Sequence, residues 1–333
     1  MRWGFVGPGR IAAKVAADLA LSEGGTLHAV GSRSLDRARA FADAHDAARA
    51  YGSYGELLDD ADVDAVYIAT PHRQHHAVAM AAIDAGKHLL VEKAFTSTLA
   101  GTVEVVEAAR AAGVFCMEAM WTRFQPAVAT VHGLIAEGAI GEIRSVRADF
   151  GLRMPFDRKD RLWDPAQGGG ALLDLGVYPV AFVQSVFGGA PATLDVSGVT
   201  ASTGVDAEAT LLWHTADDRV GFGQCSLLSA LSGTADVLGT HGWFELPPNF
   251  HHAQSFTLYQ VLEDGRSMRS ETFSAPATGI GYSHELDEVH RCVAAGLTES
   301  PIMSLNDTVT IMGVLEQALH ALGVHFDEAE VAL

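Results

Sequence analysis

Three residues in the sequence carry side chains that could move or stabilise a proton. Lys93 directly follows the strand-like run 88–92, and Tyr178 comes four residues after Asp174 in a segment with a helical pattern. Residues four apart are neighbours on an α-helix, so Asp174 and Tyr178 are expected to share one face. An ammonium, a carboxylate and a phenol are suited to general acid/base and electrostatic catalysis. Taken alone, the Asp174–Tyr178 pair is more often structural, so the surrounding elements must decide.

The first third of the chain alternates short apolar runs with helical stretches, which is typical of a parallel sheet with crossover helices. The strands predicted from this pattern are 3–6, 26–31, 65–70, 88–92 and 114–119, and the helices are 11–21, 35–45, 75–85 and 99–112. We therefore expect an α/β fold in which residues 1–122 form an N-terminal Rossmann domain with a doubly wound parallel sheet.

From residue 141 the pattern changes to alternating strands, as in an antiparallel sheet. We expect residues 123–333 to form a C-terminal α+β domain for substrate binding and oligomerisation. Its sheet should be large, open and mostly antiparallel, and its last helices, about 305–323, should pack back toward the first domain. An open apolar face is usually covered by a partner, which predicts a homodimer or homotetramer. The apolar strand residues available for this are Val196, Leu211, Trp213, Phe222 and Leu238.

Composition narrows the classes of function. The 333 residues carry a net charge of −19, which disfavours binding to nucleic acid or to a membrane surface. Three widely spaced cysteines offer neither a disulfide framework nor a metal motif. No apolar run approaches the roughly 20 residues of a membrane span, and the first residues do not resemble a signal peptide. These features predict a cytoplasmic protein whose ligand is a small molecule.

A glycine-rich turn should bind a dinucleotide. The first predicted strand is followed at once by a match to GxGxxA, namely Gly7-Pro8-Gly9-Arg10-Ile11-Ala12. In this pattern the glycines allow a tight turn and a close approach of the pyrophosphate, and the following helix start favours anions. The alternative is a purely structural turn. The position of the motif between a strand and a helix favours the dinucleotide.

The end of the second strand distinguishes NADP from NAD. NAD sites usually carry an acidic residue there for the ribose 2′-hydroxyl. This chain has Ser32 and Arg33 instead, with Arg37 one turn later. A guanidinium can pair with a 2′-phosphate, so we expect NADP (NADPH), with NAD as the alternative. Both arginines could instead be solvated residues of the helix start.

Polar clusters follow three further strands, at the edge where a Rossmann sheet binds its ligands. They comprise Thr70, Pro71, His72 and His75 after one strand, Glu92 and Lys93 after the next, and Trp121 with Arg123 after the third. The histidines could suggest a metal. No acid or cysteine completes a ligand set at recognisable spacing, and the neighbours His75 and His76 face different ways on a helix, so we expect no metal.

Together these motifs resemble a known family. GPGRIA (7–12), TPHRQHH (70–76), VEKAF (91–95), MEAMWTRF (117–124), GGGALLDLGVYPV (168–180) and the closing segment 284–319 occur in the family's order. The chain resembles the Gfo/Idh/MocA oxidoreductases over essentially its whole length. Within them it is most similar to the branch of dihydrodiol dehydrogenases and NADP-dependent D-xylose dehydrogenases.

The resemblance implies roles for individual residues. Lys93 would contact the nicotinamide ribose and the substrate, and Tyr178 would be the acid/base, with Asp174 orienting it or binding a substrate hydroxyl. Trp121, Arg123 and Trp163 match positions that line the nicotinamide and substrate side. The chain has Ala94 where the family usually has proline.

These residues predict an NADP-dependent oxidoreductase that moves a hydride between the nicotinamide and a carbinol of a sugar, polyol or cyclic trans-diol. A free phenol has a pKa of about 10, and a neighbouring ammonium would favour the phenolate. The alternatives are a non-catalytic NADP(H)-binding redox sensor, or a different reductase or lyase reaction on the same scaffold.

Overall fold

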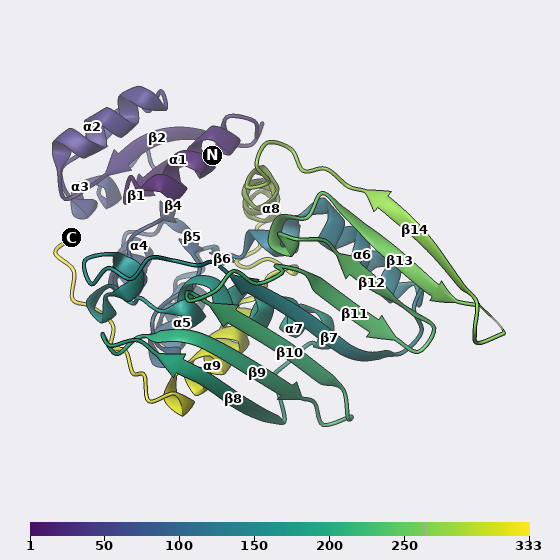
Figure 1. Ribbon diagram of the computed structural model, residues 1–333. Coiled ribbons are helices and arrows are strands. Elements are labelled where there is room, and N and C mark those ends of the chain that lie inside the picture. The colour runs from purple at the N-terminus through teal and green to yellow at the C-terminus, as the bar shows by residue number, and fades with distance from the viewer. Residues whose placement is uncertain (263) are drawn as a thin grey trace. The chain divides into compact units, whose positions relative to one another are not determined.

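The structure, a computed structural model, describes residues 1–262 and 264–333 (Figure 1). It divides into two compact units. The first unit comprises Met1–Met120, Thr278–Met312 and Phe326–Leu333, and the second comprises Trp121–Ala277 and Gly313–His325. The expected boundary after residue 122 therefore lies within two residues of a boundary between units. The expected single domain 123–333 differs from the structure, because two later segments belong to the first unit.

The first unit contains a six-stranded parallel sheet in the order β3-β2-β1-β4-β5-β6. Its strands are β1 (Arg2–Val6), β2 (Thr26–Gly31), β3 (Arg49–Tyr51), β4 (Ala65–Ile68), β5 (His88–Glu92) and β6 (Cys116–Ala119). The helices among them are α1 (Arg10–Leu19), α2 (Leu35–Ala44), α3 (Tyr54–Leu58), α4 (His75–Asp84) and α5 (Leu99–Ala112). This strand order confirms the predicted Rossmann fold, and the order reverses between β1 and β4. The short elements β3 and α3 were not predicted.

Helix α8 (Ser283–Ala294) joins the first unit through contacts between residues far apart in the sequence. The carboxylate of Asp18 on α1 accepts hydrogen bonds from three successive backbone N–H groups, those of residues 280–282. On β1, the indole N–H of Trp3 donates to Nε2 of His290 over 2.9 Å. These contacts explain why the segment groups with the N-terminal sheet. The next helix, α9 (Leu305–Ala321), begins in the first unit and ends in the second.

The second unit contains an eight-stranded sheet in the order β14-β13-β12-β11-β7-β10-β9-β8. Among the described strands of this sheet, the β7–β10 pair alone is parallel. The strands are β7 (Ile143–Gly151), β8 (Thr193–Thr200), β9 (Asp206–His214), β10 (Val220–Ser226), β11 (Ala235–Gly239), β12 (Gly242–Leu246), β13 (Ser255–Val261) and β14 (Met268–Ser274). The unit also holds α6 (Pro126–Ala136) and α7 (Val177–Phe187), and α7 packs on β7 and β10. The large, mostly antiparallel sheet is therefore confirmed.

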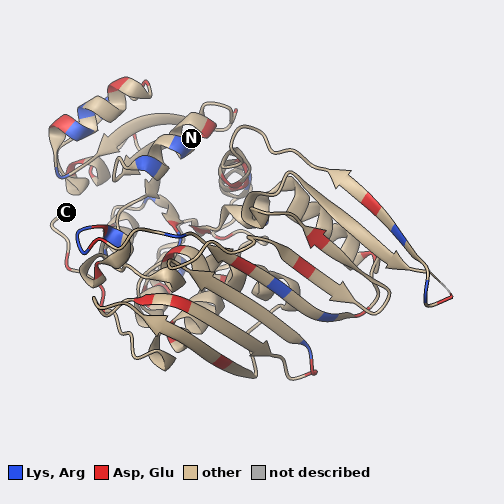
Figure 2. Cartoon of the chain, in the orientation of Figure 1, with Lys and Arg blue, Asp and Glu red and all other residues tan. Residues whose placement is uncertain are grey.

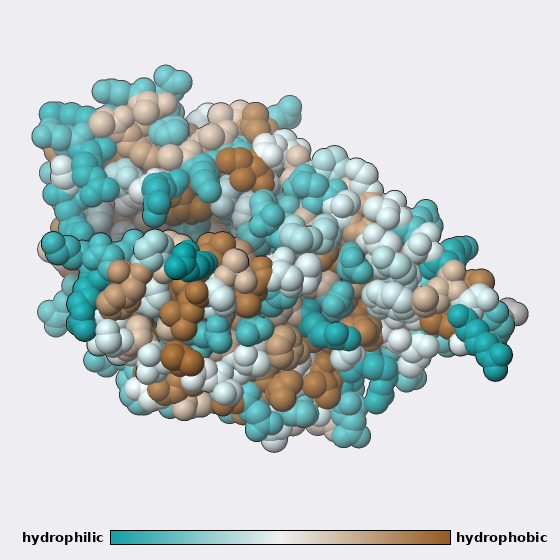
Figure 3. All heavy atoms as spheres, in the orientation of Figure 1, coloured by the Kyte–Doolittle hydropathy of each residue, from teal (hydrophilic) through white to brown (hydrophobic). Residues whose placement is uncertain are grey.

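The two faces of this sheet differ. Leu211 and Trp213 on β9 are each 3% exposed, whereas Leu212 between them is 40% exposed. Because side chains alternate along a strand, Leu211 and Trp213 point to the covered face, and the expectation that they lie on the open face was wrong. The open face instead carries Leu212 and the stacked rings of Trp243 and Tyr259, whose centroids are 4.5 Å apart. Figure 3 shows hydrophobic side chains among hydrophilic ones over these strands.

Acidic residues are distributed along the chain in both units and are not gathered in one segment (Figure 2). One helical segment, Pro165–Phe187, is apolar and long enough to span a membrane by those two criteria, contrary to the expectation from sequence. Its apolar window is 83% buried inside the protein, as in the core helix of a folded domain. Its composition is therefore explained by packing in the second unit.

Candidate active site

The glycine turn of the first unit connects β1 to α1. Gly7 has a φ of +89°, and a Cβ built there would lie 2.8 Å from the carbonyl oxygen of Ala69, so only glycine fits without strain. Gly9 caps α1 in an extended conformation, and a Cβ on it would meet no atom of the chain closer than 3.9 Å. Gly7 is thus required by the fold. The fold places no such demand on Gly9, whose surroundings leave room for a ligand beside the free N–H groups of the helix start.

The residues expected to recognise the adenosine ribose lie at the end of β2. Ser32 is buried and Arg33 is exposed, and the Ser34 hydroxyl caps α2 by accepting the backbone N–H of Arg37 over 3.4 Å. Tyr54 on α3 is buried, which raises its pKa, while the adjacent Arg33 guanidinium lowers it. Arg33 therefore lies against a phenol and is paired with no carboxylate among the described residues. It remains able to accept an anion.

The side chains of Thr70 and His75, which follow β4, have different surroundings. Thr70 is buried, and its hydroxyl has no hydrogen-bond partner within the described chain. His75 is fully buried, with Nδ1 3.0 Å from the Ala94 carbonyl oxygen and Nε2 2.8 Å from the Thr70 carbonyl oxygen. Burial lowers the pKa of His75. Its ring therefore links the loop after β4 to the loop after β5. We had expected it to contact the cofactor, but both of its nitrogens face the backbone.

Glu92 fixes the end of β5, where Lys93 emerges. The phenol of Tyr67 donates a hydrogen bond to Glu92, and the other carboxylate oxygen accepts the Lys93 backbone N–H over 3.2 Å. Glu285 of α8 is fully buried nearby, and burial together with the charge of Glu92 holds its pKa well above the usual range. Lys93 itself is half-buried, and its peptide bond to Ala94 is cis. The half-buried Lys93 thus directly follows the buried Glu92 at the end of the strand.

In the second unit, Tyr178 and Asp174 lie on adjoining turns of different type. Residues Leu172–Gly176 form a π-helical turn that continues into α7. The assumption of α-helical spacing between Asp174 and Tyr178 was therefore wrong, because a π-turn inserts extra residues into the helix, as often happens at functional sites. Asp174 accepts a hydrogen bond from the Arg161 guanidinium over 2.8 Å. Tyr178 is buried, with 9% of its surface exposed. Each side chain is thereby held in place.

The glycine run before this turn allows a buried carboxylate to approach. Gly170 has a φ of +121°, and a Cβ there would lie 2.1 Å from an oxygen of Asp206. The Asp206 carboxylate accepts the Leu172 backbone N–H over 2.6 Å, and burial raises the pKa of Asp206 to about 6. Gly170 thus leaves room for the Asp206 carboxylate beside the start of the π-helical turn.

An aromatic cluster surrounds Tyr178. The ring centroid of Tyr178 lies 5.6 Å from that of Phe150 and 5.0 Å from that of His251. Trp121 in turn lies 5.9 Å from His251, so two expected site residues meet through a histidine that the sequence analysis missed. The only signal for it was the pair His251-His252 in a loop between predicted strands.

Arg123 and Trp163, which were also expected at the site, contact other parts of the second unit. Arg123 is buried and donates a hydrogen bond to the side chain of Gln184 on α7. Trp163 donates from its indole to the Pro155 carbonyl oxygen over 2.9 Å. Its ring lines a cavity of about 350 Å³ together with Arg153, Met154, Pro155, Phe156, Ala201, Ser202 and Leu228. Trp163 thus belongs to a different lining from that of Trp121 and His251.

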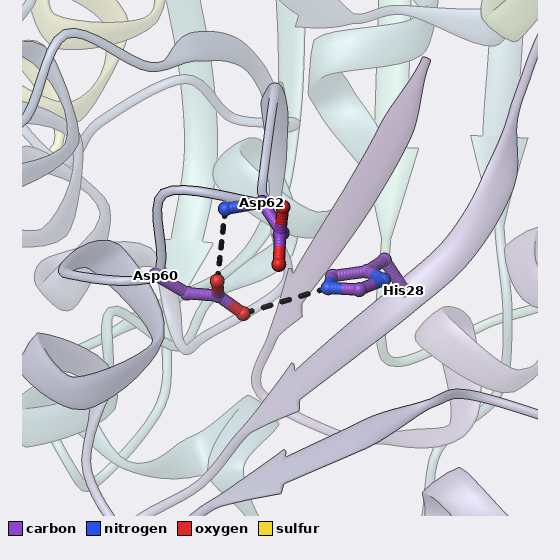
Figure 4. Close-up of side chains that lie close together, drawn as sticks. All are labelled: His28, Asp60 and Asp62. Atoms are coloured by element: carbon purple, nitrogen blue, oxygen red, sulfur yellow. Dashed lines mark hydrogen bonds and ion pairs between the residues drawn. The ribbon is translucent and has the colours of Figure 1, made fainter.

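A group of side chains with metal-binding atoms occurs within the described residues, at His28, Asp60 and Asp62 (Figure 4). Asp60 already pairs with Arg49 over 2.6 Å, and Asp62 pairs with Arg49 and Arg2 over 2.8 and 2.6 Å. The guanidinium groups balance both carboxylates, so this group is an ion-pair network among the first strands of the sheet. The ring of His76, from the histidine motif, bonds to Glu104 over 2.8 Å.

Comparisons with known proteins identify one family model in the N-terminal part of the chain and another in the part that follows. A model of the "Oxidoreductase family, NAD-binding Rossmann fold" matches residues 1–120, and one of the "GFO/IDH/MocA C-terminal domain" matches residues 128–245. The chain is 37% identical over 337 residues to a trans-1,2-dihydrobenzene-1,2-diol dehydrogenase of Homo sapiens, covering 98% of both proteins. It also resembles a 3-ketoreductase from Actinomadura kijaniata, solved with NADP and TDP-benzene (26% identity, TM-score 0.82, 96% and 97% coverage). A levoglucosan dehydrogenase solved with NADH shares the fold (21% identity, TM-score 0.87, 97% coverage of each chain).

Proposed function

The chain belongs to the Gfo/Idh/MocA oxidoreductase family, and we propose that it is an NADP-dependent dehydrogenase acting on a carbinol of a sugar, polyol or cyclic trans-diol. The match to dihydrodiol dehydrogenases over 98% of the chain carries this proposal. It spans both units, and therefore both Lys93 and Tyr178.

Two observations support binding of the dinucleotide to the first unit. Gly9 leaves open space at the start of α1, and the buried hydroxyl of Thr70 lacks a hydrogen-bond partner within the described chain. Backbone N–H groups of the turn would hold the pyrophosphate, and Ser32 and Arg33 would hold a 2′-phosphate. Solved relatives bind NADP or NADH, so the preference for NADP rests on these side chains. When bound, the nicotinamide supplies or accepts the hydride.

The protein's own part in the reaction is the movement of one proton. We assign Tyr178 as the group that takes the proton of the substrate hydroxyl during oxidation and returns it during reduction. The positive charge of Lys93 would favour the phenolate and stabilise an alkoxide on the substrate. Asp174, held by Arg161, would orient a substrate hydroxyl. The proposal requires the Lys93 ammonium and the Tyr178 phenol to act on the same oxygen atom.

The aromatic cluster supports a cyclic substrate. Phe150, Trp121 and His251 around Tyr178 offer flat, largely apolar surfaces, and such rings bind the C–H faces of sugars and cyclic diols. A panel of trans-dihydrodiols, aldoses and inositols, assayed with NADP and NAD by nicotinamide absorbance, tests the proposal. We expect turnover with at least one cyclic diol or sugar, faster with NADP. No turnover with any member of the panel, despite NADPH binding, would contradict catalysis of this class.

We also propose that the chain forms a homodimer or homotetramer through the open face of the second unit's sheet. This face exposes Leu212 and carries the stacked pair Trp243 and Tyr259. Apolar strand faces of this kind are usually covered by a partner. A molar mass of one chain from light scattering at micromolar concentration would contradict this assembly.

A further inference from the structure

The last residues of the chain lie against the N-terminus of α5 in the first unit. The Glu328 carboxylate accepts hydrogen bonds from the backbone N–H groups of Ser97 and Thr98, over 3.0 and 2.8 Å. It also accepts the hydroxyls of the same two residues, over 2.7 and 2.8 Å. A carboxylate at the start of a helix also interacts favourably with the helix dipole. One side chain from the end of the chain thus holds both residues in front of the helix.

The neighbours of Glu328 bind a second loop. Arg73 donates from Nε to the carbonyl oxygen of Asp327 over 2.6 Å, and the backbone N–H of Ala329 donates to the carbonyl oxygen of Arg73 over 2.7 Å. Arg73 lies in the loop after β4, and Ser97 lies in the loop after β5. Residues 327–329, the C-terminal strap, therefore connect the two loops at the carboxyl ends of adjacent strands.

Both loops carry residues assigned above to the reaction. Lys93 stands four residues before Ser97, and Thr70 stands three before Arg73. His75 links the same two loops from within, through its contacts to the carbonyl oxygens of Thr70 and Ala94. The loop that bears Lys93 is therefore held on one side by a buried imidazole and on the other by the strap.

We propose that Glu328 is a positioning residue for Lys93, and that the C-terminal strap keeps the two loops in the geometry that catalysis needs. This inference rests on the proposed function, because it takes its importance from the role of Lys93. A carboxylate with four hydrogen bonds restrains a loop more tightly than a neutral cap, since charge-assisted bonds are the stronger ones. Small displacements of a catalytic group can cost large factors in rate.

The test uses two variants that disturb Glu328 in different ways. Glu328→Ala removes the carboxylate. Gly101→Ala places a Cβ where the nearest atom, a carboxylate oxygen of Glu328, lies 2.7 Å away, and so displaces the end of that side chain. Because alanine favours a helix over glycine, this second variant keeps α5 stable. Glu328→Gln retains an acceptor without the charge, and Glu330→Ala on the exposed side of the tail is the control.

We expect kcat to fall roughly 10- to 100-fold in Glu328→Ala and to fall in the same direction in Gly101→Ala. In the oxidation direction, the acidic limb of the pH profile of kcat should move to higher pH in both, because Lys93 would favour the Tyr178 phenolate less and the phenol would lose its proton only at a higher pH. Glu328→Gln should be intermediate, and Glu330→Ala should match the wild type. Wild-type kcat and pH profile in both disturbing variants, or a loss of kcat that only follows the folded fraction measured by thermal unfolding, would overturn the proposal.

Lys93→Met separates this inference from the proposed function. If Lys93→Met loses turnover while Glu328→Ala and Gly101→Ala keep it, the strap does not position the lysine and the proposed function stands. If Lys93→Met keeps wild-type turnover, the role assigned to Lys93 and the strap's role are both wrong, whereas the absence of turnover in the wild type with any member of the substrate panel is what would contradict the proposed function.

Discussion

The ring of His251 lies against the ring of Tyr178, with centroids 5.0 Å apart and planes inclined by 38°. His251 is itself buried, and its backbone carbonyl oxygen accepts the hydroxyl of Thr122 over 2.9 Å. The loop that carries it is thereby fixed in the second unit. The phenol assigned to proton transfer therefore has an imidazole ring beside it. A substitution of His251 changes the surroundings of Tyr178 as well.

Replacing His251 should alter substrate binding more than chemistry. His251→Ala removes a ring that packs on Tyr178 and Phe150, and we expect the substrate KM to rise about tenfold, in line with the loss of one aromatic contact. His251→Phe keeps a ring of similar size and should stay near the wild-type KM. Steady-state kinetics at saturating NADP distinguish the two. An equal loss of kcat in both variants would show that the imidazole takes part in proton transfer.

Arg33 should determine the choice of cofactor. Arg33→Asp replaces a cation by an acid at the end of β2, so the ratio of kcat/KM for NADP over NAD should fall by roughly a hundredfold or more, the scale of a lost charge-assisted contact plus repulsion. Arg39→Asp, on the exposed side of α2, changes the charge equally and serves as the control. An unchanged ratio in Arg33→Asp would refute the assignment of the 2′-phosphate site.

Substitutions of the two glycines in the first turn should have different effects, one on NADPH binding and the other on the stability of the fold. Gly9→Val meets open space and an ordinary extended backbone, so it should abolish NADPH binding with little change in Tm. Gly7→Val meets a backbone carbonyl at a positive φ and should lower stability by about 1 to 3 kcal/mol. Nucleotide fluorescence and thermal unfolding measure the two effects. Tight NADPH binding by Gly9→Val would place the dinucleotide elsewhere.

Asp206 should make stability depend on pH. Burial raises the pKa of Asp206 from 3.8 to about 6, so the folded state holds a proton that the unfolded state has already lost in that interval. The stability from this group is full below the unfolded pKa and is lost as pH rises through the folded one. Relative to Asp206→Asn, the wild type should lose on the order of 2 kcal/mol between pH 4 and 6.

Urea unfolding of both proteins at pH 4.5 and 6.5 tests this expectation. The amide of Asp206→Asn still offers an oxygen to the Leu172 backbone N–H, so the variant should fold. A difference in unfolding free energy between the two proteins that is the same at both pH values would show that Asp206 is already ionised at the lower pH.

The sequence predicted the elements that hold the site more accurately than the contacts within it. The run 88–92 and the helix 99–112 were predicted with the bounds that the structure has, because apolar periodicity marks them locally. Asp18 caps the segment before α8 from more than 260 positions away, and no local pattern indicates such a partner. For the same reason, no local pattern indicated that residues 278–312 and 326–333 group with the first unit.

Two errors at the site have equally specific causes. A helical apolar pattern does not reveal an i→i+5 turn inside a helix, so it could not distinguish the π-turn at Leu172–Gly176 from an α-turn. His75 was expected to face the cofactor because it follows β4, but its nitrogens meet the backbone of two loops whose approach depends on the tertiary fold. Residue types thus indicated candidates for the chemistry, whereas the hydrogen-bond partners of these side chains required the structure.

Tyr178→Phe tests the central claim most directly. The substitution removes only the phenolic oxygen from a buried ring whose neighbours are Phe150 and His251. We predict that kcat falls about a hundredfold or more, as for the loss of a general acid/base, while the Kd for NADPH stays within twofold of the wild type. Wild-type turnover by Tyr178→Phe would contradict the assignment of Tyr178 as the group that exchanges a proton with the substrate.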